Sequence, residues 1–135
     1  MNKYLVDTNI FLRILQKDNL KMFDACKKLF EKCEQGKIKL YTSNLVILEL
    51  VWTLKNFYKE KKEQIVDEIF SILNFPNLEI EDKELLLETL MLWQHKNTDF
   101  SDVYNYVLAK KTNITNIYSY DKDFDQFDKK IRIEP

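Results

Sequence analysis

Residues 4–9 read YLVDTN, and this segment decides the fold class that we expect. Three consecutive apolar residues followed at once by Asp7, Thr8 and Asn9 are typical of a short strand that is buried on both faces. We therefore predict a strand over residues 3–7 and a helix over residues 8–16. A buried strand that runs straight into a helix indicates an α/β unit, in which the next strand lies parallel to the first.

The rest of the chain repeats this alternation of strands and helices. Further strands are predicted at 38–41, 78–80, 116–120 and 131–133. Further helices are predicted at 20–35, from Thr42 or Ser43 to about 58, at 61–74, 82–96 and 101–112, with a helical turn around 122–127. Strands separated by helices imply a parallel sheet that helices cover on both faces.

Length and composition indicate one soluble domain, residues 1–135, without a glycine-rich nucleotide site. The chain has 135 residues, a net charge of −1 and one glycine, Gly36, which excludes P-loop and dinucleotide-binding loops. Asp7 and Arg13 interrupt the first apolar stretch, so we expect no signal peptide. No apolar run approaches the roughly 20 residues of a membrane helix, and we expect no membrane association and a cytoplasmic location.

The cysteines and the histidine do not indicate a zinc site. Cys26 and Cys33 lie seven residues apart on one predicted helix, too far apart to bond, and we expect buried or half-buried thiols. His95 is the only histidine, so a zinc site would lack ligands.

Four acids, by contrast, stand where a structural protein would not need them. Asp7 follows the first strand, Glu49 interrupts the apolar run 45–52, Asp102 opens a helix, and Asp121 ends a strand. Two carboxylates about 4 Å apart repel by roughly 4 kcal/mol at an effective dielectric of about 20. A hard divalent cation relieves such repulsion. Ligands of parallel sheets bind beyond the carboxyl ends of the strands, where Asp7 and Asp121 are expected.

Each acid also has a structural interpretation. Asp7 could cap the first helix, and Asp99 or Ser101 with Asp102 could form a cap and a favourable first turn. Asp121, together with Asp123 and Asp125, lies in a polar turn where Asp is common. Glu49 fits a structural role least, because a carboxylate among apolar neighbours is costly unless paired, although a polar stripe with Thr53 and Asn56 could expose it. The remaining acids, including Glu60, lie in charge-rich stretches and are interpreted as solvated.

In order and spacing, the four acids make the whole chain resemble a PIN-domain ribonuclease, specifically the VapC-like toxins of type II toxin–antitoxin pairs. Residues 4–9 resemble the family's first motif, and Thr42-Ser43 with Leu48-Glu49-Leu50 resemble the second. Residues 99–102 (DFSD) resemble the third and residues 119–124 (SYDKDF) the fourth. Val103 stands where a small residue is common, which leaves open whether Asp99 or Asp102 is the principal acid. Asp123 raises the same question about Asp121.

The resemblance implies a PIN-like three-layer α/β/α fold with a central five-stranded parallel sheet. It implies Mg²⁺ or Mn²⁺ bound in an acidic pocket, endonucleolytic cleavage of RNA, homodimerisation and inhibition by an antitoxin protein. In this assignment Asp7 and Asp102 are the main metal ligands, Asp121 binds a second ion or its water, and Glu49 orients the attacking water or binds metal. Hydrogen-bonding support would come from Thr8, Asn9 and Ser119, with Asp99 and Asp123 as further acids beside the ligands.

Other functions fit the sequence less well. A housekeeping RNA-processing enzyme or a DNA nuclease of the same fold is an alternative. A phosphatase or phosphotransfer domain is another, but its site would want an acid at Asn9. Lysines that could contact RNA phosphates, or form solvated helix surface, are Lys55, Lys59, Lys61, Lys62, Lys110 and Lys111.

Overall fold

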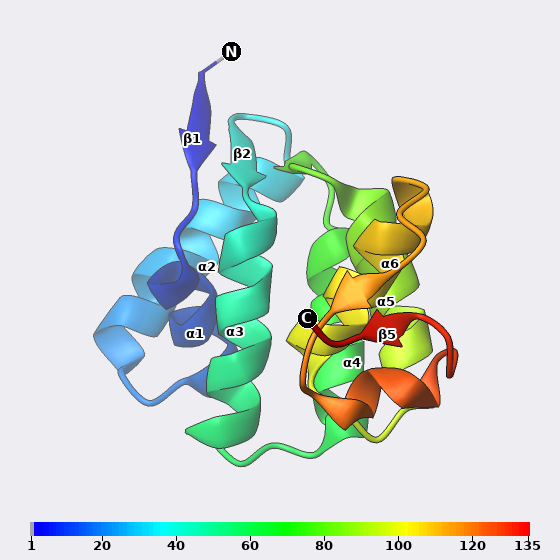
Figure 1. Cartoon of the computed structure of the whole chain (residues 1–135). Helices are drawn as coiled ribbons and strands as arrows, with labels where there is room; N and C mark the ends of the chain where they lie inside the picture. Colours follow the sequence, from blue (N-terminus) through cyan, green and yellow to red (C-terminus); the bar gives the residue numbers. More distant parts are fainter. Residues whose placement is uncertain (1) are drawn as a thin grey trace. The chain divides into compact units, whose positions relative to one another are not determined.

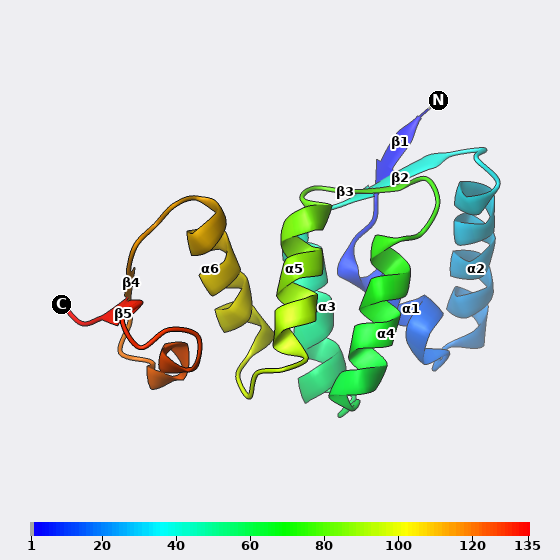
Figure 2. The same cartoon turned by 90° about the vertical axis from the view of Figure 1, so that its right-hand side faces the viewer.

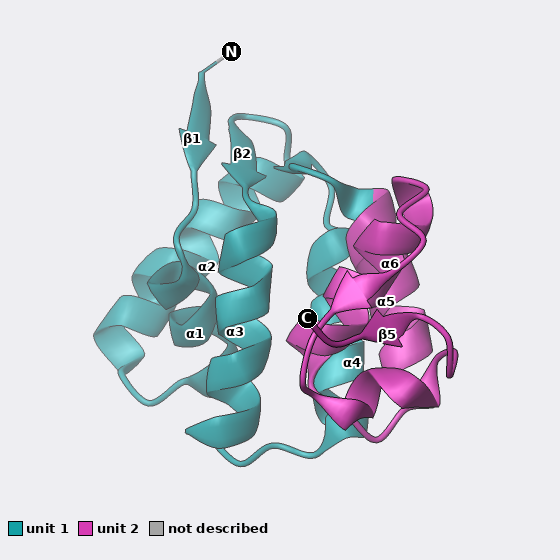
Figure 3. Cartoon of the chain, in the orientation of Figure 1, with its two compact units in different colours: residues 1–83 teal, residues 84–135 magenta. Residues whose placement is uncertain are grey.

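Five short strands alternate with helices in the computed structural model, which describes residues 2–135 (Figure 1). The chain divides into two units, residues 1–83 and 84–135, coloured separately in Figure 3. Each unit is a small assembly of helices and parallel strands, so the α/β class expected from the sequence is confirmed.

Unit 1 contains the first three strands and four helices. In chain order these are β1 (Lys3–Leu5), α1 (Thr8–Gln16), α2 (Leu20–Glu34), β2 (Lys39–Thr42), α3 (Asn44–Asn56), α4 (Lys62–Leu73) and β3 (Leu78–Ile80). The strands pair in the order β1-β2-β3, all parallel, with Tyr4 opposite Leu40 and Leu40 opposite Leu78. In Figure 2 the strands lie above α2, α3 and α4.

The helices of unit 1 form where the sequence has apolar residues at helical spacing. Cys26, Phe30 and Cys33 make the buried stripe of α2, and both cysteines are free thiols, as expected. Gly36, at a φ of +76°, lies two residues beyond α2, in a conformation that glycine adopts at little cost. The Ser43 side chain caps α3 by accepting a hydrogen bond from the Val46 amide at 3.2 Å.

The expectation that the first strand is buried on both faces is wrong. All three residues of β1 are exposed, and Leu5 keeps 69% of its surface accessible; only Val6, just beyond the strand, is buried. The strand is also shorter than the predicted 3–7. Within unit 1, β1 has one neighbouring strand, β2, and so forms an edge of the three-stranded sheet.

Unit 2 contains the remaining elements, with α5 starting at the boundary. These are α5 (Lys83–Trp93), α6 (Phe100–Lys111), β4 (Ile117–Tyr118), the 3₁₀ helix η1 (Lys122–Gln126) and β5 (Arg132–Ile133). The Trp93 indole donates to the Thr98 carbonyl at 3.0 Å and its ring packs edge-on against Phe100. Arg132 binds Asp125 at 3.0 Å, which ties β5 to η1.

The strands of unit 2 pair only with each other among residues 2–135. β4 and β5 are parallel, with Ile117 opposite Arg132. All five strands expected from the sequence are therefore found in the expected order, but they pair as three and two and not as one run of five. β4 and β5 have two residues each, which limits each to a few ladder hydrogen bonds. Within residues 2–135, no helix combines the length and the apolar character needed to span a bilayer.

Candidate functional site

Asp7 is positioned by the carboxyl ends of two neighbouring strands in unit 1. The Val6 amide donates to the Tyr41 carbonyl at 2.8 Å, and the Thr42 hydroxyl donates to the Val6 carbonyl at 2.9 Å. These bonds fix the backbone directly before Asp7. Asp7 occupies the N-cap position of α1, but its side chain makes no capping hydrogen bond. The Asp7 carboxylate therefore does not cap α1, which was the structural alternative to a functional role.

Glu49 of α3 belongs to the same place in unit 1. The Thr8 hydroxyl, from the first turn of α1, donates to a Glu49 carboxylate oxygen at 2.8 Å. Glu49 is exposed, because it faces outward from a helix whose opposite side carries Ile47, Leu50 and Leu54 into the core. The sequence allowed a polar stripe on this helix that would expose Glu49, and the exposure of Glu49 agrees with it. The Thr53 hydroxyl in that stripe donates to the Glu49 backbone carbonyl at 2.8 Å.

An open cavity of about 460 Å³ brings these side chains together. Its lining residues, five of them polar, come from α1, α3 and the residue before α1: Asp7, Thr8, Asn9, Leu12, Glu49, Trp52 and Thr53. Four residues assigned from the sequence, Asp7, Thr8, Asn9 and Glu49, share this cavity. Two carboxylates that line one cavity and are accessible to water can bind a cation from solution.

In unit 2, Asp102, Asp121 and Asp123 form a second acidic group. One carboxylate oxygen from each lies within 4.8 Å of the others. Asp102 is half-buried in the first turn of α6, while Asp121 and Asp123 are exposed at the start of η1. Burial, followed by the charge of Asp121, raises the pKa of the Asp102 carboxyl. The Thr98 hydroxyl, which donates to Asp102 at 3.3 Å, opposes that rise.

Local turns hold Asp121 and Asp123 in this arrangement. The Asp121 amide donates to the Ser119 hydroxyl oxygen at 2.9 Å, and the Asp123 amide donates to an Asp121 carboxylate oxygen at 2.9 Å. Ser119 therefore supports the backbone at Asp121. Asp99 is the N-cap residue of α6 without a side-chain cap, and its charge also contributes to the raised pKa of Asp102. Asp99 lies outside the three-carboxylate group found in residues 2–135.

The donor atoms of both groups suit a hard divalent cation. Carboxylate oxygens, a threonine hydroxyl and an asparagine amide are ligands or ligand supports for Mg²⁺ and Mn²⁺, whereas thiolates and imidazoles are ligands for softer metals. Three carboxylate oxygens within 4.8 Å of one another are an arrangement that an ion of this type would stabilise by cancelling their repulsion. The residues present therefore fit Mg²⁺ or Mn²⁺.

A third acidic cluster, in unit 1, was missed by sequence reasoning. Glu60 and Glu68 are half-buried and their carboxyl groups interact, and the oxygens Glu60 Oε1 and Glu68 Oε2 find no hydrogen-bond partner among the described residues. Gln16 donates to Glu60 at 2.6 Å and Gln64 donates to Glu68 at 3.2 Å. Burial, then the Glu60 carboxyl, raises the pKa of Glu68 to about 7.

A half-buried carboxyl beside a second carboxyl favours a proton on one of the two, as the raised pKa of Glu68 indicates. A shared proton would relieve the repulsion between Glu60 and Glu68. The contacts of the pair with each other and with Gln16 join α4, the connection between α3 and α4, and α1. Glu68 also lines an apolar cavity of about 260 Å³ with Phe11, Phe30 and Phe75, where a neutral acid is favoured over a charged one. The burial of Glu68 could have been predicted from the sequence, because Glu68 lies at helical spacing from Ile65 and Ile72 on the buried face of α4.

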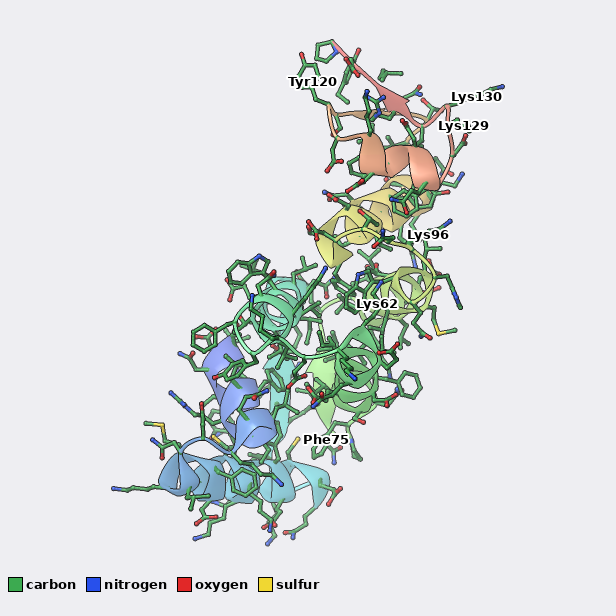
Figure 4. All side chains as sticks on the ribbon, turned by 90° about the horizontal axis from the view of Figure 1, so that it is seen from below. Lys62, Phe75, Lys96, Tyr120, Lys129 and Lys130 are labelled. Atoms are coloured by element: carbon green, nitrogen blue, oxygen red, sulfur yellow. The ribbon has the colours of Figure 1, made fainter. Side chains whose placement is uncertain are left out.

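The candidate RNA-contacting lysines differ in their surroundings. Lys111 lies 3.5 Å from both Glu84 and Glu88, whereas the Lys110 amine lies 5.9 Å from the centre of the Tyr106 ring. In unit 1, burial and the nearby Lys55 charge lower the pKa of Lys62. Figure 4 shows Tyr120, which precedes Asp121, on one side of η1 and Lys129 and Lys130 on the other.

Comparison with known proteins gives the following matches. The family model described as the PIN domain matches residues 4–130. A protein named VapC ribonuclease from Aquifex aeolicus (strain VF5) is 31% identical over 120 residues, which cover 89% of this chain and 88% of that protein. The crystal structure of Mycobacterium tuberculosis VapC20, described as a sarcin-ricin loop cleaving toxin, matches 99% of this chain and 100% of that one, at 17% identity and a TM-score of 0.42.

Proposed function

This chain belongs to the PIN-domain family, and we propose that it is a metal-dependent endoribonuclease that acts as the toxin of a toxin–antitoxin pair. Family membership rests on the match over residues 4–130 and on the similarity to a VapC ribonuclease. The structural observation that carries the chemistry is the group formed by Asp102, Asp121 and Asp123, with their oxygens within 4.8 Å. Such a group suits a divalent ion and phosphodiester hydrolysis.

The proposed metal site uses the four acids that the sequence pattern singled out. We assign Asp7, Glu49, Asp102 and Asp121 to one site for Mg²⁺ or Mn²⁺, with Asp7 and Asp102 as main ligands. The cavity of unit 1 supports the assignment of Asp7 and Glu49, since both line it. The proximity of Asp123 to Asp121 and Asp102 makes Asp123 a further ligand candidate, ahead of Asp99.

Side chains of this chain would perform the proton and positioning steps. A bound divalent ion supplies a lowered pKa of the attacking water and stabilisation of charge on the phosphate. Glu49, oriented by the Thr8 hydroxyl, would accept the proton of that water. Thr98 holds one oxygen of Asp102, which leaves the other to face the ion. Asn9 and Ser119 would support the ligands on either side.

We further propose that residues 1–135 act as a single PIN-like domain in which the five strands form one central parallel sheet between two helical layers. The exposed backbone edge of β1 and the apolar surface of Leu5 support this, because an edge of that kind is a ready partner for another strand. Amide hydrogen exchange tests it. Slow exchange of amides in both β1 and β4 is expected, and exchange at the rate of a free edge would contradict it.

The proposed partners are an RNA substrate, an antitoxin protein and a second copy of the chain, in the cytoplasm and away from membranes. Exposed apolar side chains on the helices, including Leu45, Phe70 and Met91, support a protein interface. Light scattering at micromolar concentration should give the mass of a dimer. A monomer at that concentration would contradict homodimerisation.

The alternative functions predict different preferred substrates. A housekeeping RNA-processing enzyme or a DNA nuclease of the same fold would prefer a structured RNA or DNA. A phosphatase or phosphotransfer domain would release phosphate from a monoester and leave RNA intact. Asn9, which replaces the acid that one such site needs, disfavours that last reading.

One assay separates these possibilities. Purified protein is incubated with single-stranded RNA, structured RNA, single-stranded DNA and a phosphate monoester, each with Mg²⁺, Mn²⁺ or a chelator. We expect endonucleolytic RNA products only with a divalent ion. Intact RNA under every metal condition, with the other substrates cleaved or not, would refute the proposed function.

A further inference from the structure

Trp52 has an unusual place for a tryptophan. It lies on α3, three residues and so about one helical turn beyond Glu49, and keeps 66% of its surface accessible to solvent. The other tryptophan, Trp93, is 0% exposed. An indole left in water forgoes a large burial energy, so exposed tryptophans commonly mark binding surfaces.

The surroundings of Trp52 indicate what it binds. It lines the same cavity of about 460 Å³ as Asp7 and Glu49, and five of the seven lining residues are polar. A purely apolar partner would leave those polar groups without water or hydrogen bonds. A ligand with a flat apolar face next to an anionic, hydrogen-bonding part fits a wall that combines an indole with carboxylates and any cation they hold.

The backbone of α3 holds Trp52 in a fixed relation to Glu49. The Thr53 hydroxyl donates to the Glu49 carbonyl at 2.8 Å, and the Asn56 amide donates to the Trp52 carbonyl at 3.0 Å. Leu50, Val51 and Leu54 on the opposite side of the helix are buried. The indole is therefore carried by a rigid element at the edge of the acidic cavity.

We propose that Trp52 is a stacking platform for a nucleobase of single-stranded RNA, next to the phosphate that is cleaved. This inference rests on the proposed ribonuclease function. A base stacked on Trp52 would place its own backbone phosphate toward Asp7 and Glu49. Stacking accepts every base, because each has an aromatic face, so Trp52 selects unpaired nucleotides over duplex and does not select a sequence.

Kinetics of cleavage give the first test. Trp52→Ala should raise KM for a single-stranded oligonucleotide by roughly 5- to 150-fold, the range of one lost base–aromatic stack, with little change in kcat. Trp52→Phe keeps an aromatic face and should stay within about threefold of the parent. Phe57→Ala is the matched control, because Phe57 is also exposed, at 71%, but does not line the cavity. Cleavage by Trp52→Ala with an unchanged KM would overturn the proposal.

Fluorescence gives a second test, which does not depend on catalysis or on the Ala variant folding. Subtracting the emission of Trp52→Phe from that of the parent isolates Trp52, because Trp93 is buried in both. With Ca²⁺ in place of Mg²⁺, a hexamer of adenylate should quench this signal, and a hexamer of abasic ribose phosphates should not. No quenching, or equal quenching by the two hexamers, would overturn the base-stacking role.

The two proposals fail in different ways. If the parent protein cleaves no RNA but the adenylate hexamer still quenches Trp52, the nuclease assignment fails and a nucleobase site remains. If RNA is cleaved and Trp52→Ala has the parent KM, the nuclease assignment stands and the stacking role of Trp52 is refuted.

Discussion

Two pairs of carboxylates in unit 1 have the same chemistry and opposite surroundings. Asp7 and Glu49 are exposed in an open polar cavity, and Glu49 is held by the Thr8 hydroxyl. Glu60 and Glu68 are half-buried against each other beside an apolar cavity, with oxygens that lack donors among the described residues. The first pair can be neutralised by a cation from solution, and the second pair already needs a proton.

A cluster of acidic residues in a fold therefore does not by itself indicate a metal site. Access to solvent decides whether a cation or a proton reduces the repulsion between two neighbouring carboxylates. An open wall admits an ion with its remaining water ligands, whereas an enclosed apolar wall favours a neutral, protonated acid. We therefore propose that Asp7 and Glu49 bind metal, and that Glu60 and Glu68 stabilise the fold of unit 1.

The largest expected effect separates the two pairs by activity. Asp7→Asn should reduce RNA cleavage by about 10³-fold or more, because it removes a charged ligand from the proposed site. Glu68→Gln, which also exchanges an acid for its amide, should cleave RNA as the parent does. Both rates are measured at saturating Mn²⁺. Parent-like cleavage by Asp7→Asn, or a comparable loss in Glu68→Gln, would erase the distinction.

A smaller effect is expected from the hydroxyl that orients Glu49. Thr8→Val keeps the shape of the side chain and removes the 2.8 Å hydrogen bond to Glu49, so cleavage should fall by roughly 10- to 100-fold. Thr112→Val is the control, since that hydroxyl bonds only helix carbonyls, those of Leu108 and Ala109. Equal rates for the two threonine variants would show that the orientation of Glu49 is unimportant.

The enclosed pair should reveal itself in the pH dependence of stability. The pKa of Glu68 is about 7 in the folded chain against an ordinary value of 4.5. Its folded form holds a proton that the unfolded chain has lost, so the stability linked to that proton is fully present below about pH 4.5. This contribution is lost as the pH rises to about 7.

Glu68→Gln isolates this contribution, because the amide does not titrate. Between pH 4.5 and 7.5 the parent should lose roughly 1–2 kcal/mol of unfolding free energy relative to the variant, after allowance for partial exposure. Urea unfolding at a series of pH values measures it. Parallel stability curves for parent and variant would mean that Glu60 and Glu68 share no proton.

The smallest effect concerns lysines and salt. Lys111 is already held by Glu84 and Glu88, whereas Lys110 lies over the Tyr106 ring. With few phosphate contacts, the slope of log affinity against log salt should be about −2 to −3. Lys110→Ala should flatten that slope by roughly 0.7 and Lys111→Ala should leave it unchanged. A slope near zero for the parent would mean that lysines do not contact RNA.

Sequence patterns located the helices and the acids because both are local signals. The Ser43 cap, the α2 stripe and the placement of Asp7 after the first strand follow from residues close together in the chain. Asp121 and Asp123 were left as alternatives by the sequence, and the structure brings both of them to Asp102. A turn of three residues decides this, since the Asp121 side chain accepts from the Asp123 amide.

Features that depend on distant contacts could not be predicted in this way. Glu60 lies in a charge-rich stretch and was interpreted as solvated, but it meets Glu68 and Gln16 across 8 and 44 positions. The burial of the first strand was predicted from its apolar composition, yet burial depends on which elements cover a strand. Leu5 is exposed although its residue type suits a core.

The most direct test of the proposed metal site is Mn²⁺ binding by the parent and by variants of Asp7 and Asp102, the two main ligands in our assignment. Titration calorimetry should show that Asp7→Asn and Asp102→Asn each lower the affinity for Mn²⁺ by at least about tenfold. Glu68→Gln should bind Mn²⁺ with the affinity of the parent. Parent-like Mn²⁺ affinity in either Asp7→Asn or Asp102→Asn would contradict a single site built from both groups of acids.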